Sequence, residues 1–470
     1  MNLKKIALQM KEMIKQISAN QKNFFQSGQS RDVYYRKERL KKLLKVVQRY
    51  ENQIFEALAA DLGKPAFEAF TSETLLVEKE IKTILKHLKF WSQPQKVKSS
   101  LLNFPSRDYL MPEPYGAVLI ISPWNYPFQL SMTPLIGAVA AGNCVVLKPS
   151  ESAPATAAVL EKIVSEVFDP GHVCVVQGAV ETGKALLTQP WNYIFFTGGT
   201  AIGKKVAMAA AEHLTPITLE LGGKSPCIVD GTTPLKKTAR RIVWGKFLNC
   251  GQTCIAPDYL LVEESFKVPL VEALIQEIEA AFGPDPQQSK DYGRLIHKGH
   301  FERMQAFVAG NRVLYGHQTD AKSKYFGPTL VEPTDENHII LTEEVFGPIL
   351  PILTYKEPSE IHQTINRNPN PLAFYVFSHN RKFTDQLLRE FPFGGGVVND
   401  VLIQFANANL PFGGIGNSGI GAYHGYKSFE LFSHFKPIIK RRFILDLSQR
   451  YAPYKTAEFN LLKKITRWID

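Results

Sequence analysis

The N-terminal part of the chain places its hydrophobic residues at helical spacing, three or four positions apart. In the first segment these residues are Leu3, Ile6, Met10, Met13, Ile14 and Ile17, which predict a helix over 2–19. The same spacing predicts helices over 31–61 and 66–92, separated by a break at Gly63-Lys64-Pro65. This region is expected to be helical and to hold no obvious chemistry.

The pattern changes at about residue 107, where short apolar runs begin to alternate with amphipathic segments. Gly116–Ile121 ends at Ser122-Pro123 and is typical of a buried parallel strand. Further strands are predicted at Cys144–Leu147, Val173–Val176, Tyr193–Phe196 and Ile217–Leu221, with helices over 154–168 and 202–211. This alternation predicts a parallel, doubly wound sheet.

A second α/β region is predicted from about 223 to 413. Its expected strands are Cys227–Val229, Tyr259–Val262, Ile349–Tyr355, Ala373–Ser378 and Gly396–Val398. The 470-residue length fits this division, because a chain of that size is too long for one compact core. The 44% hydrophobic and 21% charged residues are typical of an ordinary soluble globular protein.

Charge and cysteine content exclude some classes of protein. The net charge is +11, but the basic residues are spread out and densest at the two ends. The sequence contains no motif of interleaved aromatic and basic residues that would predict nucleic-acid binding. No signal peptide or apolar run long enough to span a membrane is found. Five cysteines, an odd number, favour a reducing cytoplasmic location over a disulfide framework, and their spacing predicts no metal site.

Two short stretches suggest covalent chemistry. Gly251-Gln252-Thr253-Cys254 sets a thiol beside small residues, and Glu220-Leu221-Gly222-Gly223-Lys224 sets a carboxylate beside two glycines. A thiol and a carboxylate are suited to act as nucleophile and base, although a lone cysteine is more often inert packing. A third stretch, Phe196–Lys204, follows a strand and opens a helix, so its glycines would let a pyrophosphate approach the helix N-terminus. Its spacing is not that of the generic dinucleotide fingerprint.

Seven motifs, in order along the chain, resemble the NAD(P)-dependent aldehyde dehydrogenase superfamily in its short, class-3-like branch. They are Pro123-Trp124-Asn125-Tyr126-Pro127, Asn143–Glu151, Phe196-Thr197-Gly198-Gly199, Glu220–Lys224, Gly251–Cys254, Glu344-Val345-Phe346-Gly347-Pro348 and Pro411-Phe412-Gly413-Gly414. The resemblance implies an α/β fold of two doubly wound parallel-sheet domains with a small β arm that bridges subunits. We expect a cofactor-binding domain over 1–95 and 115–221, a catalytic domain over 222–413, an arm over 96–114 and 430–445, and a tail over 446–470. Within the arm, Pro94–Pro105 and Ile438–Ile444 are the expected strand partners.

The resemblance also assigns roles to residues. It implies that Cys254 is the nucleophile, that Glu220 is the base, and that Asn125 stabilises the oxyanion together with the Cys254 backbone N–H. The implied cofactor-binding residues are Trp124, Lys148, Glu151, Gly198, Gly199, Thr200, Gly203, Glu344 and Phe346. The implied substrate-lining residues are Tyr126, Trp244, Thr253 and Phe412. These roles imply oxidation of medium- or long-chain aliphatic or aromatic aldehydes with NAD, or with NADP, by a homodimer.

Three alternatives remain open at this point. A CoA-acylating or acyl-phosphate-type dehydrogenase would share the fold, but the resemblance places Glu220 in the hydrolytic branch. A noncatalytic basic binding protein would not need Cys254, Glu220 and Asn125 together. The tail Ala457–Asp470 sets Leu461, Leu462, Ile465, Trp468 and Ile469 on one helical face beside Lys463, Lys464 and Arg467, which predicts either peripheral membrane contact or packing within the protein.

Overall fold

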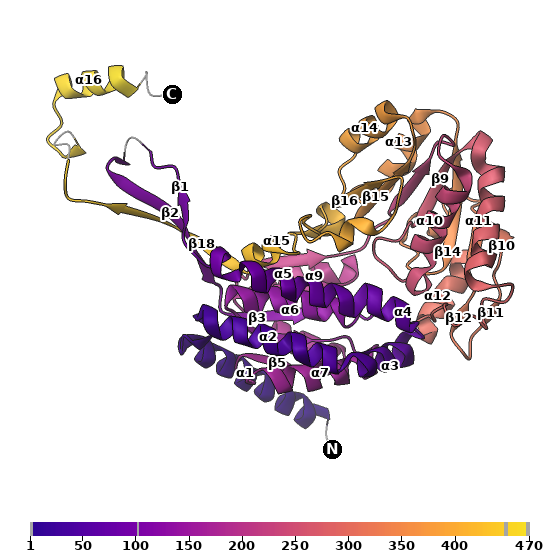
Figure 1. Ribbon diagram of the computed structural model, residues 1–470, viewed down its shortest axis with the longest axis horizontal. Helices are drawn as coiled ribbons and strands as arrows, with labels where there is room; N and C mark the ends of the chain where they lie inside the picture. Colours follow the sequence, from indigo (N-terminus) through magenta and orange to yellow (C-terminus); the bar gives the residue numbers. More distant parts are fainter. Residues whose placement is uncertain (1–2, 101–102, 446–449, 467–470) are drawn as a thin grey trace. The chain divides into compact units, whose positions relative to one another are not determined.

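The computed structural model describes residues 3–100, 103–445 and 450–466 (Figure 1). The chain divides into two units, the first made of 1–92 and 114–434 and the second of 93–113 and 435–470. The predicted α/β class with two mainly parallel sheets is confirmed. Within the described residues, no helix combines the length and the apolarity needed to cross a bilayer.

Unit 1 begins with a layer of helices. They are α1 (Leu3–Gln26), α2 (Val33–Arg49), α3 (Glu51–Leu62), α4 (Ala66–Ala69), the π-helical turn η2 (Phe70–Thr74) and α5 (Leu75–Trp91). The helix predicted over 31–61 is therefore two helices, which separate at Tyr50 (φ −90°, ψ 5°). Gly63, at φ 61°, ends α3 in the left-handed region that favours glycine. Figure 1 shows α2, α5 and α6 (Gln129–Ala141) running alongside one another, and they are in contact.

The first sheet has six strands in the order β17-β7-β6-β3-β4-β5. The strands are β3 (Ala117–Ile121), β4 (Cys144–Lys148), β5 (Val173–Val175), β6 (Tyr193–Thr197), β7 (Ile217–Glu220) and β17 (Gly419–Ile420). All are parallel except β17, which pairs antiparallel with β7. Helices α6, α7 (Pro154–Val167), α8 (Val180–Leu187) and α9 (Thr200–Ala211) connect them, and α15 (Tyr426–Leu431) packs on α6. Every residue of β4 is buried, as its continuous apolar run predicts.

The second sheet has seven strands in the order β10-β13-β14-β9-β8-β15-β16. They are β8 (Pro226–Val229), β9 (Tyr259–Glu263), β10 (Arg312–Tyr315), β13 (Thr329–Glu332), β14 (Ile349–Tyr355), β15 (Ala373–Phe377) and β16 (Gly395–Val398). The connecting helices are α10 (Leu235–Phe247), α11 (Lys267–Phe282), α12 (Lys298–Val308), α13 (Pro358–Asn366) and α14 (Arg381–Glu390), and β11 (Thr319–Asp320) pairs with β12 (Tyr325–Phe326). The sequence did not predict β10, which is partly or fully exposed along its length and has a weak apolar pattern, or β13, which is mostly buried but only four residues long.

Unit 2 contains a three-stranded sheet in the order β1-β2-β18. The strands are β1 (Gln95–Val97), β2 (Ser106–Pro114) and β18 (Ser433–Arg441), followed by α16 (Thr456–Thr466). The expected pairing of Pro94–Pro105 with Ile438–Ile444 is therefore wrong, since the long strand of this arm begins at Ser106. Side chains of β2 are all partly or fully exposed, so no apolar run marked it. Trp468 and Ile469 of the predicted tail face lie outside the described residues, as does the Ile465 side chain.

Candidate active site

The loop before Cys254 is held in an unusual backbone conformation. Asn249, Cys250 and Gly251 have φ of 52°, 54° and 71°, three consecutive left-handed residues. A side chain at Gly251 would collide with the backbone carbonyl of Gly347, so only glycine fits this close approach. Strain of this kind persists only where the surrounding structure imposes it, and it is common at functional sites. The loop leaves Cys254 half-buried, with its thiol facing its own N–H and that of Ile255.

Hydrogen bonds tie Asn125 to this loop. The Asn125 Nδ2 donates to the Gln252 carbonyl at 3.1 Å, and the Asn249 Nδ2 donates to the Asn125 carbonyl at 2.8 Å. Beside them, the Tyr126 hydroxyl lies 2.6 Å from Thr253 Oγ1. The structure thus brings the predicted oxyanion donor to the Cys254 loop. An amide carries two N–H groups, and the Asn125 hydrogen bond to the Gln252 carbonyl uses one of them.

Glu220 ends β7 with its side chain 2% exposed. Neither carboxyl oxygen has a hydrogen-bond partner among the described residues. Burial therefore raises the pKa of Glu220 well above its usual value. A buried carboxyl without partners is unfavourable for stability and is typical of a group kept for chemistry.

Cys254, Glu220 and Glu344 lie close enough to interact electrostatically. Burial first, then the carboxyl groups of Glu344 and Glu220, raise the pKa of the Cys254 thiol above its ordinary value. Burial, followed by the charge of Asp258, also raises the pKa of Glu344 to about 8. The thiol is therefore protonated at rest, and forming the thiolate requires a proton acceptor.

The segment that carries Glu344 is fixed by a buried ion pair between Lys224 and Asp258. Lys224 Nζ also donates to the carbonyls of Ile340 and Glu343, at 2.7 and 2.8 Å. Asp258 Oδ1 accepts from the N–H of Val345 at 2.8 Å. Gly222 leaves room for the Glu344 carboxyl, which a Cβ at that position would displace. The motif Glu220–Lys224 thus supplies the candidate base, a glycine gap and an anchoring cation in five consecutive residues.

The predicted cofactor residues that end or follow β4 and β6 lie at the carboxyl edge of the first sheet, whereas Glu344 and Phe346 precede β14 of the second sheet. Helix α9 begins at Thr200 after Gly199, with no side-chain cap and with open space at Gly199. The N–H of Gly198 donates to the Glu220 carbonyl at 3.0 Å, which joins this turn to the candidate base. Gly203 lies against Leu221, where a Cβ would come within 2.6 Å of Cδ2. At the end of β4, Lys148 donates to Glu151 Oε2 at 2.6 Å.

These residues fit a dinucleotide. A long helix with an uncapped N-terminus suits a pyrophosphate, because its N–H groups and dipole favour anions. Two buried hydroxyls at the same sheet edge, Ser122 Oγ and Thr197 Oγ1, have no partner among the described residues. Open parallel sheets bind ligands at this edge.

Trp124 and Phe346, two further predicted cofactor residues, are in contact through their rings. Their rings are 5.4 Å apart at 86°, and His300 lies 5.5 Å from Trp124. His300 Nε2 lies 2.8 Å from the Phe346 carbonyl, and Phe346 has a positive φ of 52°. His300 therefore supports the backbone of the Glu344–Pro348 motif, a contact that no sequence motif indicated.

A cavity of about 520 Å³ has Cys254 in its wall. Tyr126, Trp244 and Thr253 line it as predicted. Most other lining side chains are apolar, among them Phe67, Leu76, Leu130, Val243, Phe282, Leu402, Ile403 and Phe405. Four charged residues, Glu68, Arg240, Glu277 and Asp291, also reach it, and Arg240 pairs with Glu277 at 2.9 Å.

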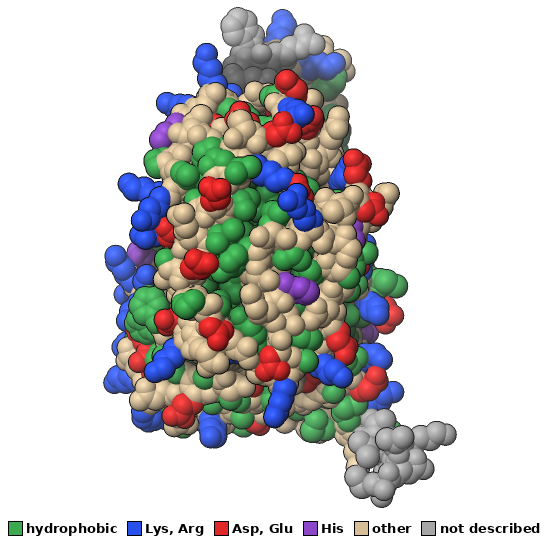
Figure 2. Space-filling model, turned by 90° about the vertical axis from the view of Figure 1, so that its right-hand side faces the viewer, with side chains coloured by type: hydrophobic (Ala, Val, Ile, Leu, Met, Phe, Trp, Pro, Cys, Tyr) green, Lys and Arg blue, Asp and Glu red, His purple; other side chains and the backbone are tan. Residues whose placement is uncertain are grey.

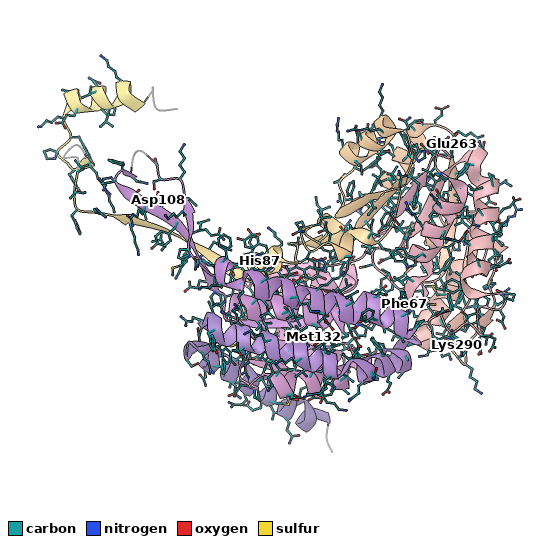
Figure 3. The ribbon with its side chains drawn as sticks, in the orientation of Figure 1. Phe67, His87, Asp108, Met132, Glu263 and Lys290 are labelled. Carbon is teal, nitrogen blue, oxygen red and sulfur yellow. The ribbon has the colours of Figure 1, made fainter. Side chains whose placement is uncertain are left out.

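Two features of this cavity were not expected from the sequence. Phe412 is not among its lining residues, but its ring centroid lies 4.8 Å from that of Phe405, which does line it. The N-terminal helices are not without a role, because Pro65–Leu76 contributes six lining residues, including Phe67 at the end of the helical layer (Figure 3). Phe67 is 76% exposed. A large apolar residue outside the buried face of a helix is the signal that would have indicated that this segment lines a cavity.

Comparisons with known proteins agree with this geometry. The family model described as "Aldehyde dehydrogenase family" matches residues 2–438. The 4,4'-diaponeurosporen-aldehyde dehydrogenase of Staphylococcus aureus is 44% identical over 96% of this chain and 98% of its own length. Aldehyde dehydrogenase family 3 member H1 of Arabidopsis thaliana is 44% identical over 94% and 92%. The solved substrate-bound state of Staphylococcus aureus AldH has a TM-score of 0.94 at 44% identity and covers 96% of this chain and 99% of that one. The chain therefore belongs to the aldehyde dehydrogenase family, as an NAD(P)-dependent enzyme with relatives in its class-3 branch.

Proposed function

We propose that this enzyme oxidises hydrophobic aldehydes, medium- or long-chain aliphatic or aromatic, to carboxylic acids. The observation that carries the substrate class is the largely apolar cavity that ends at the Cys254 thiol. Its volume of about 520 Å³ suits a chain of many methylene groups, each of which gains about 0.8 kcal/mol on leaving water.

Cys254 attacks the aldehyde carbon as a thiolate. The proton leaves the thiol for Glu220, directly or through a water molecule, because the Glu220 carboxyl has no competing partner. The oxygen of the resulting thiohemiacetal is then held by the second N–H of Asn125 and by the backbone N–H of Cys254. The network around Asn125 fixes these donors before substrate arrives.

Glu220 also serves the second half of the reaction. The nicotinamide cofactor, when bound, supplies the acceptor for the hydride that leaves the substrate carbon. A thioester of Cys254 remains, and Glu220 passes the thiol proton on to solvent. Its carboxylate then takes a proton from water, hydroxide adds to the thioester carbonyl, and the acid is released as Cys254 leaves as a thiolate. The buried, unpaired carboxyl suits this role, because its raised pKa makes the ionised form a stronger base than an exposed glutamate; the molecules in which Glu220 is ionised are the ones that react.

For the cofactor we propose NAD with NADP accepted. The support is Glu151, which pairs with Lys148 at the sheet edge and is 41% exposed on its side chain. A carboxylate there disfavours a 2′-phosphate by charge repulsion, while Lys148 offers a partner that limits the penalty.

An absorbance assay of cofactor reduction tests these proposals together. Aldehydes from acetaldehyde to long-chain and aromatic members are compared with NAD and with NADP, without added CoA. We expect kcat/KM to rise with chain length and the free acid to be the product. Turnover only with CoA or phosphate, or faster turnover of glycolaldehyde or betaine aldehyde than of hydrophobic aldehydes, would contradict the proposal.

The cavity predicts a chain-length effect for Ala281→Trp. Ala281 lines the cavity and is exposed, so a large side chain there narrows the space without disturbing the core. We expect kcat/KM to fall about 10- to 100-fold for a long-chain aldehyde and to stay near parent for propanal. Ala321→Trp, at an exposed alanine outside the cavity, is the matched control and should change neither value. Equal losses for both aldehydes would refute a chain-binding role for the cavity.

We further propose a homodimer, on the resemblance alone, and a cytoplasmic enzyme whose unit 2 contacts anionic membranes. Unit 2 holds 12 of the 55 Lys and Arg residues but 5 of the 44 Asp and Glu, a net +7 of the total +11. On the face of the molecule in Figure 2, by contrast, basic and acidic side chains are interspersed. On α16, Phe459 and Leu461 are 55% and 59% exposed beside Lys463 and Lys464. An exposed apolar helix in a strongly basic unit matches an anionic surface.

Vesicle flotation of the full chain tests this contact. At low salt we expect binding to vesicles of a roughly physiological composition, with about 30% phosphatidylserine, and we expect the binding to weaken as salt rises. Vesicles of phosphatidylcholine alone should bind little of the protein. Lys463→Glu with Lys464→Glu should weaken binding by about tenfold or more, since each basic residue near the surface contributes about 1 kcal/mol. If the parent does not bind vesicles and the double variant differs from it in molar mass in solution, α16 instead contacts a second copy of the chain.

A further inference from the structure

A buried ion pair joins Lys64 and Glu73, two residues of the N-terminal helices. Both side chains are 0% exposed. Lys64 lies in the break between α3 and α4, and Glu73 lies in the π-helical turn η2. Such a pair is unfavourable to bury unless further hydrogen bonds satisfy both groups. Those hydrogen bonds show what the pair does.

Among the described residues, the further side-chain hydrogen bonds of the pair all go to one segment, residues 125–129. Glu73 Oε2 accepts from the N–H groups of Phe128 and Gln129, at 3.0 and 2.9 Å, where α6 begins. A carboxylate at a helix N-terminus is favourable, because it satisfies free N–H groups and complements the helix dipole. Glu73 therefore fixes the start of α6. In Figure 3 the labelled Phe67 marks α4, which lies between Lys64 and Glu73 in the sequence, and the labelled Met132 marks α6.

Lys64 fixes the other end of the same segment. Its Nζ donates to the Asn125 carbonyl at 3.2 Å and lies 4.2 Å from the centre of the Tyr126 ring. The same Asn125 carbonyl accepts from Asn249, and the Tyr126 hydroxyl contacts Thr253. One cation thus reaches both residues that face the Cys254 loop.

We propose that Lys64 and Glu73 are positioning residues for the reaction, which hold the Asn125 amide and Tyr126 at the place that the transition state requires. Neither residue lines the cavity that reaches Cys254, so they act through Asn125 and Tyr126. This inference rests on the proposed role of Asn125 as oxyanion donor. A shift of this segment would break its hydrogen bonds to the buried pair and leave those charged groups incompletely satisfied.

A double-mutant cycle tests the inference on the full-length enzyme. Lys64→Met keeps the apolar stem and removes the charge, and it is made in the parent and in Asn125→Ala. We expect Lys64→Met to lower kcat about 10- to 100-fold in the parent, with KM for the aldehyde little changed, since a small displacement of a catalytic group has this effect. In Asn125→Ala the same change should lower kcat by less than about twofold, because the two residues act as one unit.

The outcomes separate this inference from the proposed function. A loss of kcat that is equal in both backgrounds, or no loss in a folded Lys64→Met enzyme whose melting temperature alone falls, would overturn the positioning role. If Asn125→Ala itself retains full kcat, the oxyanion role fails and this inference fails with it. Glu73→Gln, which keeps the shape and one acceptor, enters the same cycle if Lys64→Met does not fold, and the same criteria decide.

Discussion

Cys254→Ala is expected to lower kcat for aldehyde oxidation by about 10⁴-fold or more, as the loss of a covalent nucleophile does. The substitution removes the only sulfur in the wall of the cavity, so no thiohemiacetal can form there. The protein should remain folded, because Cys254 is half-buried and makes no side-chain hydrogen bond to another side chain. Cofactor reduction with a hydrophobic aldehyde measures the loss, and circular dichroism checks the fold.

Cys250→Ala is the matched control. Cys250 is buried four residues earlier, with its Sγ 3.6 Å from the Tyr292 hydroxyl and away from the cavity. Burial raises the pKa of its thiol to about 12, and it also raises that of Cys254, but Cys250 is not among the residues that line the cavity, so a substrate there does not reach it. We expect activity within a few-fold of parent and a small loss of stability. If Cys254→Ala keeps substantial activity, or if Cys250→Ala loses its activity, the assignment of Cys254 as the nucleophile is wrong.

Glu220→Gln should stop the enzyme after the first half of the reaction. Without the base, hydrolysis of the thioester slows by about 10²- to 10⁴-fold. We expect a burst of reduced cofactor near one equivalent per site, followed by a slow steady rate, with acyl-enzyme on Cys254 detectable by mass spectrometry. The burst itself requires another proton acceptor, which water provides at raised pH. Full turnover in this variant would exclude Glu220 as the base.

Glu80→Gln controls for the loss of a buried carboxyl. Glu80 is 5% exposed and accepts from the N–H of Gly425 at 2.9 Å, so it anchors a turn rather than facing the cavity. This variant should keep its activity and lose some stability.

Glu220→Gln should do the opposite to stability. The raised pKa means that folded Glu220 stays protonated after the unfolded group has ionised. Holding this proton lowers the free energy of unfolding of the parent. The loss is absent below about pH 4.5 and grows as pH rises from there toward the raised pKa. We therefore expect the stability of Glu220→Gln to rise relative to that of the parent as pH increases above about 4.5, and chemical denaturation of both proteins at several pH values measures the difference.

Much of the fold follows from local pattern. The apolar run at Ala117–Ile121 and the one at Cys144–Lys148 are buried parallel strands, as continuous hydrophobicity predicts. Strand β2 was missed because its side chains are half-exposed and its hydrophobic signal is weak. The pairing of Pro94–Pro105 with Ile438–Ile444 was wrong for the same reason, because without an apolar run nothing in the sequence marked where β2 begins.

The sequence by itself determined the kinds of residue available for chemistry and the order of the elements that carry them. Cys254, Glu220 and Asn125 are recognisable because each lies in a short motif, and a motif is a local property. The tertiary structure alone decided which distant residues meet. The contact of Asn125 with Gln252 spans 127 positions and that of Glu73 with Phe128 spans 55. Packing of helices and sheets sets such contacts, and it also removes water from Glu220, which is why burial, pKa and the positioning by Lys64 could not be predicted from residue order.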